Sequence, residues 1–251
     1  MKLEQIWRYP FKGFAGLQSE HIALRTRQIL AGDRQFAITT GHPKTHAQLD
    51  TGWLAKRHFI QQANLPALAR FRLDHNPDTQ HITLYEQDKK VIEAGAGEYG
   101  LICDWLYEKL PEAFIEKPRL VQLGDGGYTD TAAPWISLGT TASLNHFAEK
   151  TGTVPDMRRF RLNLLIDAEI AFTEFSWAGH ILHIGEAQLE IIEPVGRCSA
   201  INANQDTGGI EADFLSAMPD LFNHTDLGVF ASVIHPGEIR NGDKVVLGNR
   251  L

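Results

Sequence analysis

The sequence predicts a mainly β protein with a few helices, of the α+β class. Short segments rich in apolar and β-branched residues recur along the chain, and turn-forming Gly, Asn, Asp and Pro residues separate them. Two segments instead have the apolar period of a helix. With 251 residues, the chain is long enough to bury a large core without disulfides or a structural metal.

In the first half, four segments are predicted as strands: 3–9, 21–30, 35–40 and 81–86. Their spacing fits a small barrel or sandwich. Residues 98–110 are predicted as a helix because five apolar residues share one face: Leu101, Ile102, Trp105, Leu106 and Leu110. Two prolines then interrupt the chain, and we place a boundary between domains 1–112 and 113–251.

In the second half, a helix is predicted over 143–150, with Ser143 as its N-cap and Gly152 just past its end. Residues 160–166 alternate between apolar and polar, which predicts a strand on which Arg161 and Asn163 point the same way. The other predicted strands are 180–184, 188–193, 229–234 and 244–247. The segment HPGEIRNGD before the last of them is predicted to be a turn.

The overall charge narrows the class of partner. The chain has 24 Lys and Arg against 31 Asp and Glu, a formal net charge of −7. A protein surface that binds nucleic acid or an anionic membrane needs an excess of basic residues, so we expect neither partner. No apolar run reaches the ~20 residues that cross a bilayer, and we see no signal peptide. We expect a cytoplasmic protein with free thiols.

Cys198 is the first candidate for a reactive residue. It follows Arg197 and lies among Gly, Ser and Asn, and a neighbouring guanidinium favours the thiolate, which is both the nucleophile and the metal ligand. The alternative is an inert buried cysteine acting as a small apolar residue. That is our interpretation of Cys103, which falls within the predicted helix.

Arginines are the second candidate group. Residues 111–251 carry 10 basic and 19 acidic residues, yet four arginines fall within a short stretch: Arg158, Arg159, Arg161 and Arg197. Such a cluster indicates a local anion site, although solvated surface ion pairs are an open alternative. A guanidinium at Arg161 beside the amide of Asn163 suits a phosphate or the edge of a heteroaromatic ring, and a solvent-facing strand surface is equally compatible.

Taken together, the motifs resemble the MOSC family, named after the C-terminal domain of molybdenum cofactor sulfurases. In the first half, Tyr9-Pro-Phe-Lys-Gly13 and Gly32-Asp33-Arg34-Gln35-Phe36 are similar to its YPxKS and GDRxW/F elements. In the second half, the similar segments follow in the family's order: 142–145, 158–163, 177–185, 197–198 with 206–208, and 236–245. The two-domain organisation resembles the mitochondrial amidoxime-reducing component and its bacterial relatives.

The resemblance implies an N-terminal β-barrel-like domain packed on a MOSC β-barrel domain. It also implies a molybdenum–molybdopterin cofactor with Cys198 as the metal ligand, and Cys198 and Asp206 as candidate catalytic residues. The implied cofactor-binding residues are Lys12, Arg34, Ser143, Arg161, Asn163, Gly196 and Arg197. Gly13 departs from the family's serine and removes a hydroxyl donor. Pyridoxal phosphate is not expected, because it binds to a separate domain that 251 residues cannot include.

The implied activity is the reduction of small N-hydroxylated substrates by oxygen transfer to the Cys-ligated molybdenum. We expect a separate electron-donor protein, because the chain leaves no room for a ferredoxin-like domain with its own cysteines. Two alternatives stay open. One is a non-catalytic cofactor carrier or a sulfur relay that uses Cys198, and the other is a β-barrel interaction domain with an empty site.

Overall fold

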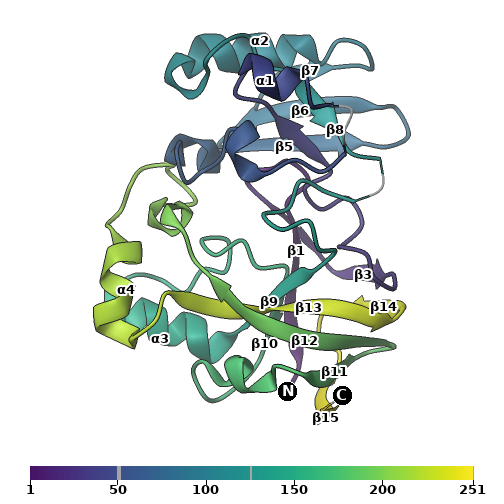
Figure 1. Ribbon diagram of the computed structural model, residues 1–251, viewed down its shortest axis with the longest axis vertical. Coiled ribbons are helices and arrows are strands. Elements are labelled where there is room, and N and C mark those ends of the chain that lie inside the picture. Colours follow the sequence, from purple (N-terminus) through teal and green to yellow (C-terminus); the bar gives the residue numbers. More distant parts are fainter. Residues whose placement is uncertain (50–51, 125, 251) are drawn as a thin grey trace.

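A computed structural model describes residues 1–49, 52–124 and 126–250. Its largest sheet has eight strands, and every neighbouring pair except β9–β10 is antiparallel (Figure 1). In spatial order the strands are β15 (Val245–Arg250), β11 (His180–Ile184), β12 (Ala187–Gly196), β13 (Asp226–His235), β9 (Ile136–Thr140), β10 (Leu164–Ile166), β1 (Leu3–Arg8) and β2 (Leu17–Ser19).

The eight-stranded sheet curls back on itself. β15 and β2 lie at the two ends of its strand order, so the sheet is open. The start of β1 nevertheless meets the start of β15, through a bridge between Lys2 and Lys244 and three backbone hydrogen bonds that join residues 1–3 to residues 242–245. This contact gives the sheet a barrel-like form without a continuous ladder between β1 and β15.

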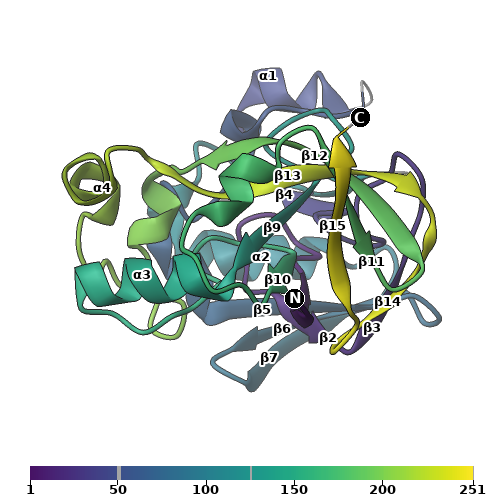
Figure 2. The same cartoon turned by 90° about the horizontal axis from the view of Figure 1, so that it is seen from below.

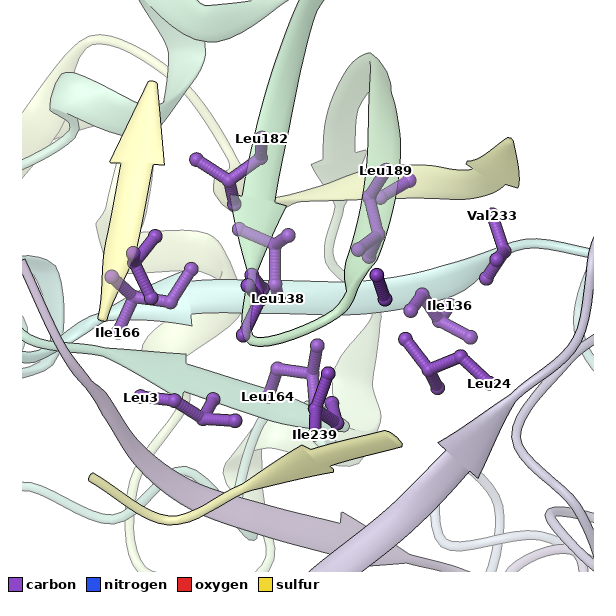
Figure 3. Close-up of a cluster of buried hydrophobic side chains, with 14 of the residues drawn as sticks. Leu3, Leu24, Ile136, Leu138, Leu164, Ile166, Leu182, Leu189, Val233 and Ile239 are labelled. Carbon is purple, nitrogen blue, oxygen red and sulfur yellow. The ribbon is translucent and has the colours of Figure 1, made fainter. Parts of the chain in front are cut away.

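The core of this sheet is built from both halves of the chain. Leu3 and Leu24 from the first half pack with Leu138, Leu164 and Leu189 from the second (Figure 3). Successive side chains in a strand point to opposite faces, so alternate residues of each strand face this core. Residues near the N-terminus therefore belong to the core of the second half.

Two helices cover one side of this sheet. α3 (Thr141–Thr151) and α4 (Phe214–Phe222) lie together there (Figure 2), and Phe147 of α3 packs on Phe214 and Phe222 of α4 with ring centroids 5.6 and 6.0 Å apart. Short 3₁₀ helices, η5 (Thr173–Trp177) and η6 (Ser199–Asn202), lie in the connections after β10 and β12.

Among the described residues there are three smaller sheets, and two of them pair a strand of residues 1–112 with a strand of residues 113–251. β5 (Phe71–Asn76), β6 (His81–Glu86) and β7 (Lys89–Ala94) form an antiparallel meander against α2 (Gly100–Lys109), which buries Ile102, Cys103 and Leu106. The two other sheets are pairs: β4 (Phe36–Ile38) with β8 (Leu120–Gln122), and β3 (His21–Leu24) with β14 (Gly237–Arg240). The remaining helices are short: α1 (Pro43–His46), η2 (Lys56–His58), η3 (Pro66–Arg70) and η4 (Pro111–Ala113).

The mainly β class and both predicted helices are confirmed, and the strands at 81–86 and 180–184 have the predicted bounds. Four local predictions are wrong. The strand predicted at 21–30 ends at Leu24, because a turn in which Arg27 has a φ of 55° follows it. The strand at 160–166 shrinks to β10, because Arg161 adopts a φ of 51° in a turn. The predicted turn at 235–243 contains β14, which pairs with β3. The cap of α3 is Thr140, whose hydroxyl accepts from the Ser143 backbone N–H at 3.2 Å.

The domain boundary at 112/113 stays a prediction. Strands of the first half take part in sheets of the second half: β1 pairs with β10, β2 pairs with β1 in the same sheet, and β3 pairs with β14. Among the described residues, no helix combines the length and the apolar character needed to cross a membrane.

Candidate functional site

A cavity of about 130 Å³ lies where the two halves of the chain meet. Lys12, Gly13, Arg34 and residues 61–63 line it from the first half. The second half contributes the rest: Thr129, Asp130, Thr131, Trp135, Ser137, Arg159, Phe160, Arg161, Asn163, Val195, Gly196, Arg197, Cys198, Ala200, Ile201 and Phe230. Cavities between packed units are frequent ligand sites.

Cys198 lies in this cavity wall at the junction between β12 and η6. Its thiol is partly exposed. The turn that follows it is braced from both halves: the Ser199 hydroxyl donates to the Ala63 carbonyl at 3.1 Å, and Arg159 Nη1 donates to the Ile201 carbonyl at 2.8 Å. Cys103 is by contrast on the buried face of α2, and burial raises its pKa to about 11.

Arg161 lines the cavity without a carboxylate as a hydrogen-bond partner. Its Nη1 donates to the Phe14 carbonyl at 2.7 Å, whereas the buried Nη2 has no partner. Burial lowers the pKa of Arg161 to about 10, and the nearby charge of Arg34 acts in the same direction. Because its hydrogen-bond partner is a neutral carbonyl, the charge of Arg161 is available to an anionic ligand.

Arg197 has the same character. Its Nη1 donates to the Phe160 carbonyl at 2.8 Å and its Nη2 donates to the Leu227 carbonyl, so both contacts are to neutral backbone groups. Its buried Nε has no partner. Burial lowers the pKa of Arg197 to about 10. Two guanidiniums in one cavity are therefore held by backbone carbonyls, and neither has a carboxylate as a hydrogen-bond partner.

Lys12 and Arg34 differ because each already has a carboxylate partner. The buried Lys12 ammonium donates to Asp130 Oδ1 at 2.6 Å and to the Tyr128 carbonyl at 2.8 Å. Burial acts to raise the pKa of Asp130, but the charge and hydrogen bond of Lys12 outweigh it and hold this pKa at about 2. Arg34 forms an ion pair with Asp33 and also donates to the Arg161 carbonyl at 3.0 Å.

The unsatisfied groups of the cavity are all donors. Among the described residues, eleven buried side-chain nitrogen or oxygen atoms lack a hydrogen-bond partner. Four of them belong to residues that line this cavity, and all four are nitrogens: Gln62 Nε2, Arg159 Nε, Arg161 Nη2 and Arg197 Nε. An unmet buried donor costs about 1–3 kcal/mol, so the cavity favours a ligand that is anionic and rich in acceptors.

The structure brings together the predicted residues Lys12, Arg34, Arg161, Asn163, Gly196, Arg197 and Cys198. The side-chain amide of Asn163 forms its hydrogen bonds with other groups of the protein. Its Oδ1 accepts from the Ser137 backbone N–H at 3.1 Å and from the Ser137 hydroxyl at 3.0 Å, and its Nδ2 donates to the Trp7 carbonyl at 3.2 Å. Asn163 therefore ties the end of β1 to β9 at the cavity floor.

The structure does not bring Ser143 and Asp206 to the cavity. Ser143 is buried within α3, where its hydroxyl donates to Glu174 Oε2 at 2.9 Å. The Asp206 side chain is 73% exposed and pairs with Arg158 Nη1 at 3.0 Å, outside the lining. Arg158, the fourth arginine of the cluster, serves that surface ion pair.

Three features of the cavity were not found in the sequence. Asp130 and Gln62 line it without a recognisable local signal, and Trp135 packs on Phe230 with ring centroids 5.4 Å apart to give it an aromatic wall. An Asp in a Gly- and Thr-rich loop is a weak pointer to Asp130. Nothing around Gln62 in the sequence distinguishes it from a surface glutamine.

Gly13, the departure from the family's serine, has a steric explanation. Its φ is +85°, and a Cβ at this position would lie 2.9 Å from both Gln61 Cα and the Ile60 carbonyl oxygen. Only glycine adopts this conformation without strain. The backbone of residues 60–61 therefore approaches Lys12-Gly13 more closely than a side chain allows.

Two family models match different parts of the chain. The family model of the MOSC N-terminal beta barrel domain matches residues 1–97, and that of the MOSC domain matches residues 131–246. No curated protein matches the sequence.

Among solved structures, the YuaD protein from Bacillus subtilis is 15% identical, with a TM-score of 0.51 over 99% of this chain and 96% of that one. YiiM from Geobacillus stearothermophilus is 21% identical, with a TM-score of 0.36 over 45% of this chain and 54% of that one. YiiM from Escherichia coli is 20% identical, with a TM-score of 0.36 over 46% and 55%. The likeness to YuaD concerns the fold alone. The regions that the two family models match lie in order along the chain, and residues of both regions line the cavity that holds Cys198. The chain belongs to the MOSC-domain family.

Proposed function

We propose that this protein binds a molybdenum–molybdopterin cofactor in the Cys198 cavity and reduces N-hydroxylated substrates. The MOSC family is associated with molybdenum cofactor-dependent enzymes. The observation that carries the proposal is a partly exposed thiol in the wall of a cavity whose four unsatisfied buried atoms are all donors.

The residues present fit this cofactor. A thiolate is a soft ligand and suits a metal that is already bound by sulfur, which assigns the metal to Cys198. Arg161 and Arg197 each have backbone carbonyls as partners and one unpaired N–H, and such groups suit the phosphate of molybdopterin. The aromatic pair of Trp135 and Phe230 offers an apolar surface to a flat ring.

When bound, the cofactor supplies the two-electron chemistry that takes the oxygen atom from an N–O bond. The overall reduction consumes two electrons and two protons and releases water. The chain provides binding and electrostatics. With a pKa held at about 2, Asp130 stays a carboxylate that pairs with Lys12 and does not donate a proton. A separate protein would deliver the electrons.

The test is expression in a host that makes the cofactor, followed by metal analysis and a reductase assay with an aromatic amidoxime and an artificial electron donor. We expect stoichiometric molybdenum and turnover in the wild-type protein. Cys198→Ala should lose both. Cys103→Ala is the matched control and should keep both, because Cys103 is on the buried face of α2 and does not line the cavity.

The outcomes separate the rival functions. Stable molybdenum without turnover would identify a cofactor carrier. A persulfide on Cys198 in protein that holds no molybdenum would identify a sulfur relay. Full molybdenum content and turnover in Cys198→Ala would contradict the assignment of the metal ligand.

A further inference from the structure

Gln62 combines three properties, of which the proposed function uses only the unsatisfied donor. Its side chain is only 1% exposed, its amide nitrogen has no hydrogen-bond partner, and it lines the Cys198 cavity. Buried amide groups are nearly always satisfied, so one that is not needs an explanation. The neighbouring Ala63 carbonyl accepts from Ser199 at 3.1 Å, which places this segment directly beside the turn that follows Cys198.

The orientation of the Gln62 amide is fixed by a second buried glutamine. Gln205 Nε2 donates to the Ala203 carbonyl oxygen at 3.2 Å. Because a backbone carbonyl can only accept, this contact identifies the nitrogen end of the Gln205 amide. The same nitrogen donates to Gln62 Oε1 at 3.1 Å. The oxygen end of Gln62 is therefore occupied, and its NH₂ end is the one left free.

We propose that Gln62 Nε2 donates a hydrogen bond to the cofactor held in the Cys198 cavity, and that Gln205 orients it to do so. This inference rests on the proposed function. The other unsatisfied donors of the cavity belong to guanidiniums. A guanidinium attracts negative charge from any direction, whereas a neutral amide N–H binds only an acceptor atom that lies along its hydrogen-bond direction. Gln62 is thus a positioning residue that recognises an acceptor nitrogen or oxygen of the cofactor.

Gln62→Glu tests the donor directly. The variant has the same shape and keeps an oxygen that accepts from Gln205, but it replaces the free NH₂ with a negatively charged oxygen that repels an acceptor. Asn64→Asp is the matched control, because it adds the same charge two residues along, on an exposed side chain outside the cavity lining.

Gln205→Glu tests the relay. A glutamate at 205 can only accept from Gln62, so the Gln62 amide must rotate and turn its own oxygen toward the ligand. The ligand contact is then lost although Gln62 itself is unchanged. A direct effect of Gln62 alone does not give this result.

The measurement is the rate at which each purified holoprotein loses molybdenum during dialysis, with the melting temperature of each cofactor-free form as a check of folding. We expect Gln62→Glu and Gln205→Glu to lose the metal at least about tenfold faster than the wild type, which corresponds to the loss of one directional contact. Asn64→Asp should match the wild type. The buried carboxylates of Gln62→Glu and Gln205→Glu should lower the melting temperature of the cofactor-free form, and loss of metal at a temperature well below every melting transition then reports the ligand contact.

Equal retention in Gln62→Glu and the wild type overturns this inference and leaves the proposed function intact. Faster loss in Gln62→Glu with unchanged retention in Gln205→Glu overturns the orienting role of Gln205. Wild-type protein that carries no molybdenum from a competent host overturns the proposed function and this inference together.

Discussion

The guanidinium of Arg161 lies over the ring of Tyr9, with 4.3 Å between its Cζ atom and the ring centroid. Arg34 lies over the same ring at 4.7 Å, and the Tyr9 hydroxyl donates to the Leu162 carbonyl at 3.2 Å. Burial raises the pKa of Tyr9, so the hydroxyl keeps its proton for that bond. One aromatic residue directly after β1 thus supports two cations of the cavity wall.

Tyr9→Leu should therefore disorder the guanidiniums of Arg34 and Arg161 and lower the molybdenum content of the purified protein several-fold. Tyr9→Phe keeps the ring under both guanidiniums and loses only the hydrogen bond to Leu162, which should cost about 1 kcal/mol of unfolding free energy. Metal analysis and urea denaturation measure the two effects. Equal molybdenum in the two variants would show that the ring does not support the site.

Gly13→Ala should destabilise the fold more than an ordinary glycine substitution does. A left-handed conformation costs a non-glycine residue about 1–2 kcal/mol, and at Gly13 the added Cβ also lies 2.9 Å from backbone atoms of residues 60–61. Gly97→Ala is the control, because Gly97 has a φ of +86° but no neighbour within 4 Å of the added Cβ. Urea denaturation should rank Gly13→Ala well below Gly97→Ala, and similar losses would contradict the steric argument.

Glu174 should make stability depend on pH. It is fully buried, its Oε2 accepts from Thr140 Oγ1 at 3.0 Å, and burial raises its pKa above the ordinary value of 4.5. The folded state then binds the proton more tightly, so this stabilisation is present below pH 4.5 and is lost as the pH rises through the folded-state pKa.

Glu174→Gln removes the titration and keeps the acceptor for Thr140. The unfolding free energy of the wild type, measured against that of this variant over a pH series, should fall as the pH rises from 4.5. Glu149→Gln, an exposed position on α3, is the control. Parallel pH profiles for the wild type and Glu174→Gln would refute this account.

The features that the sequence predicted well depend on local patterns. The helix around residues 100–109 follows from the period of its apolar side chains, and the strand at 180–184 from its bounding turn residues. The cavity residues Lys12, Arg161 and Cys198 were found because each lies in a contiguous motif. Motif membership alone also suggested Asp206, which the fold turns outward to an ion pair with Arg158.

The features that the sequence did not predict depend on distant partners. The segment of β14 has turn-forming residues, yet it pairs with β3 because the curled sheet brings the two together. The NH₂ group of Gln62 is left free by Gln205, which lies 143 positions away. Arg161 leaves the strand pattern because its left-handed backbone turns the chain into the cavity. No local pattern contains these relationships.

The pairing of Ile6 with Leu164 has a consequence for folding during synthesis on the ribosome, because the two strands that it joins are made at different times. β1 is made first, but its partner β10 emerges only after well over half of the chain has been translated, and pairings of such sequence separation form slowly. Until then Leu3 and Ile6 have no core to enter. β2 can pair with one edge of β1 early in synthesis, but the edge that pairs with β10 stays exposed until then. Exposed strand edges and apolar side chains of this kind make a nascent chain prone to aggregation.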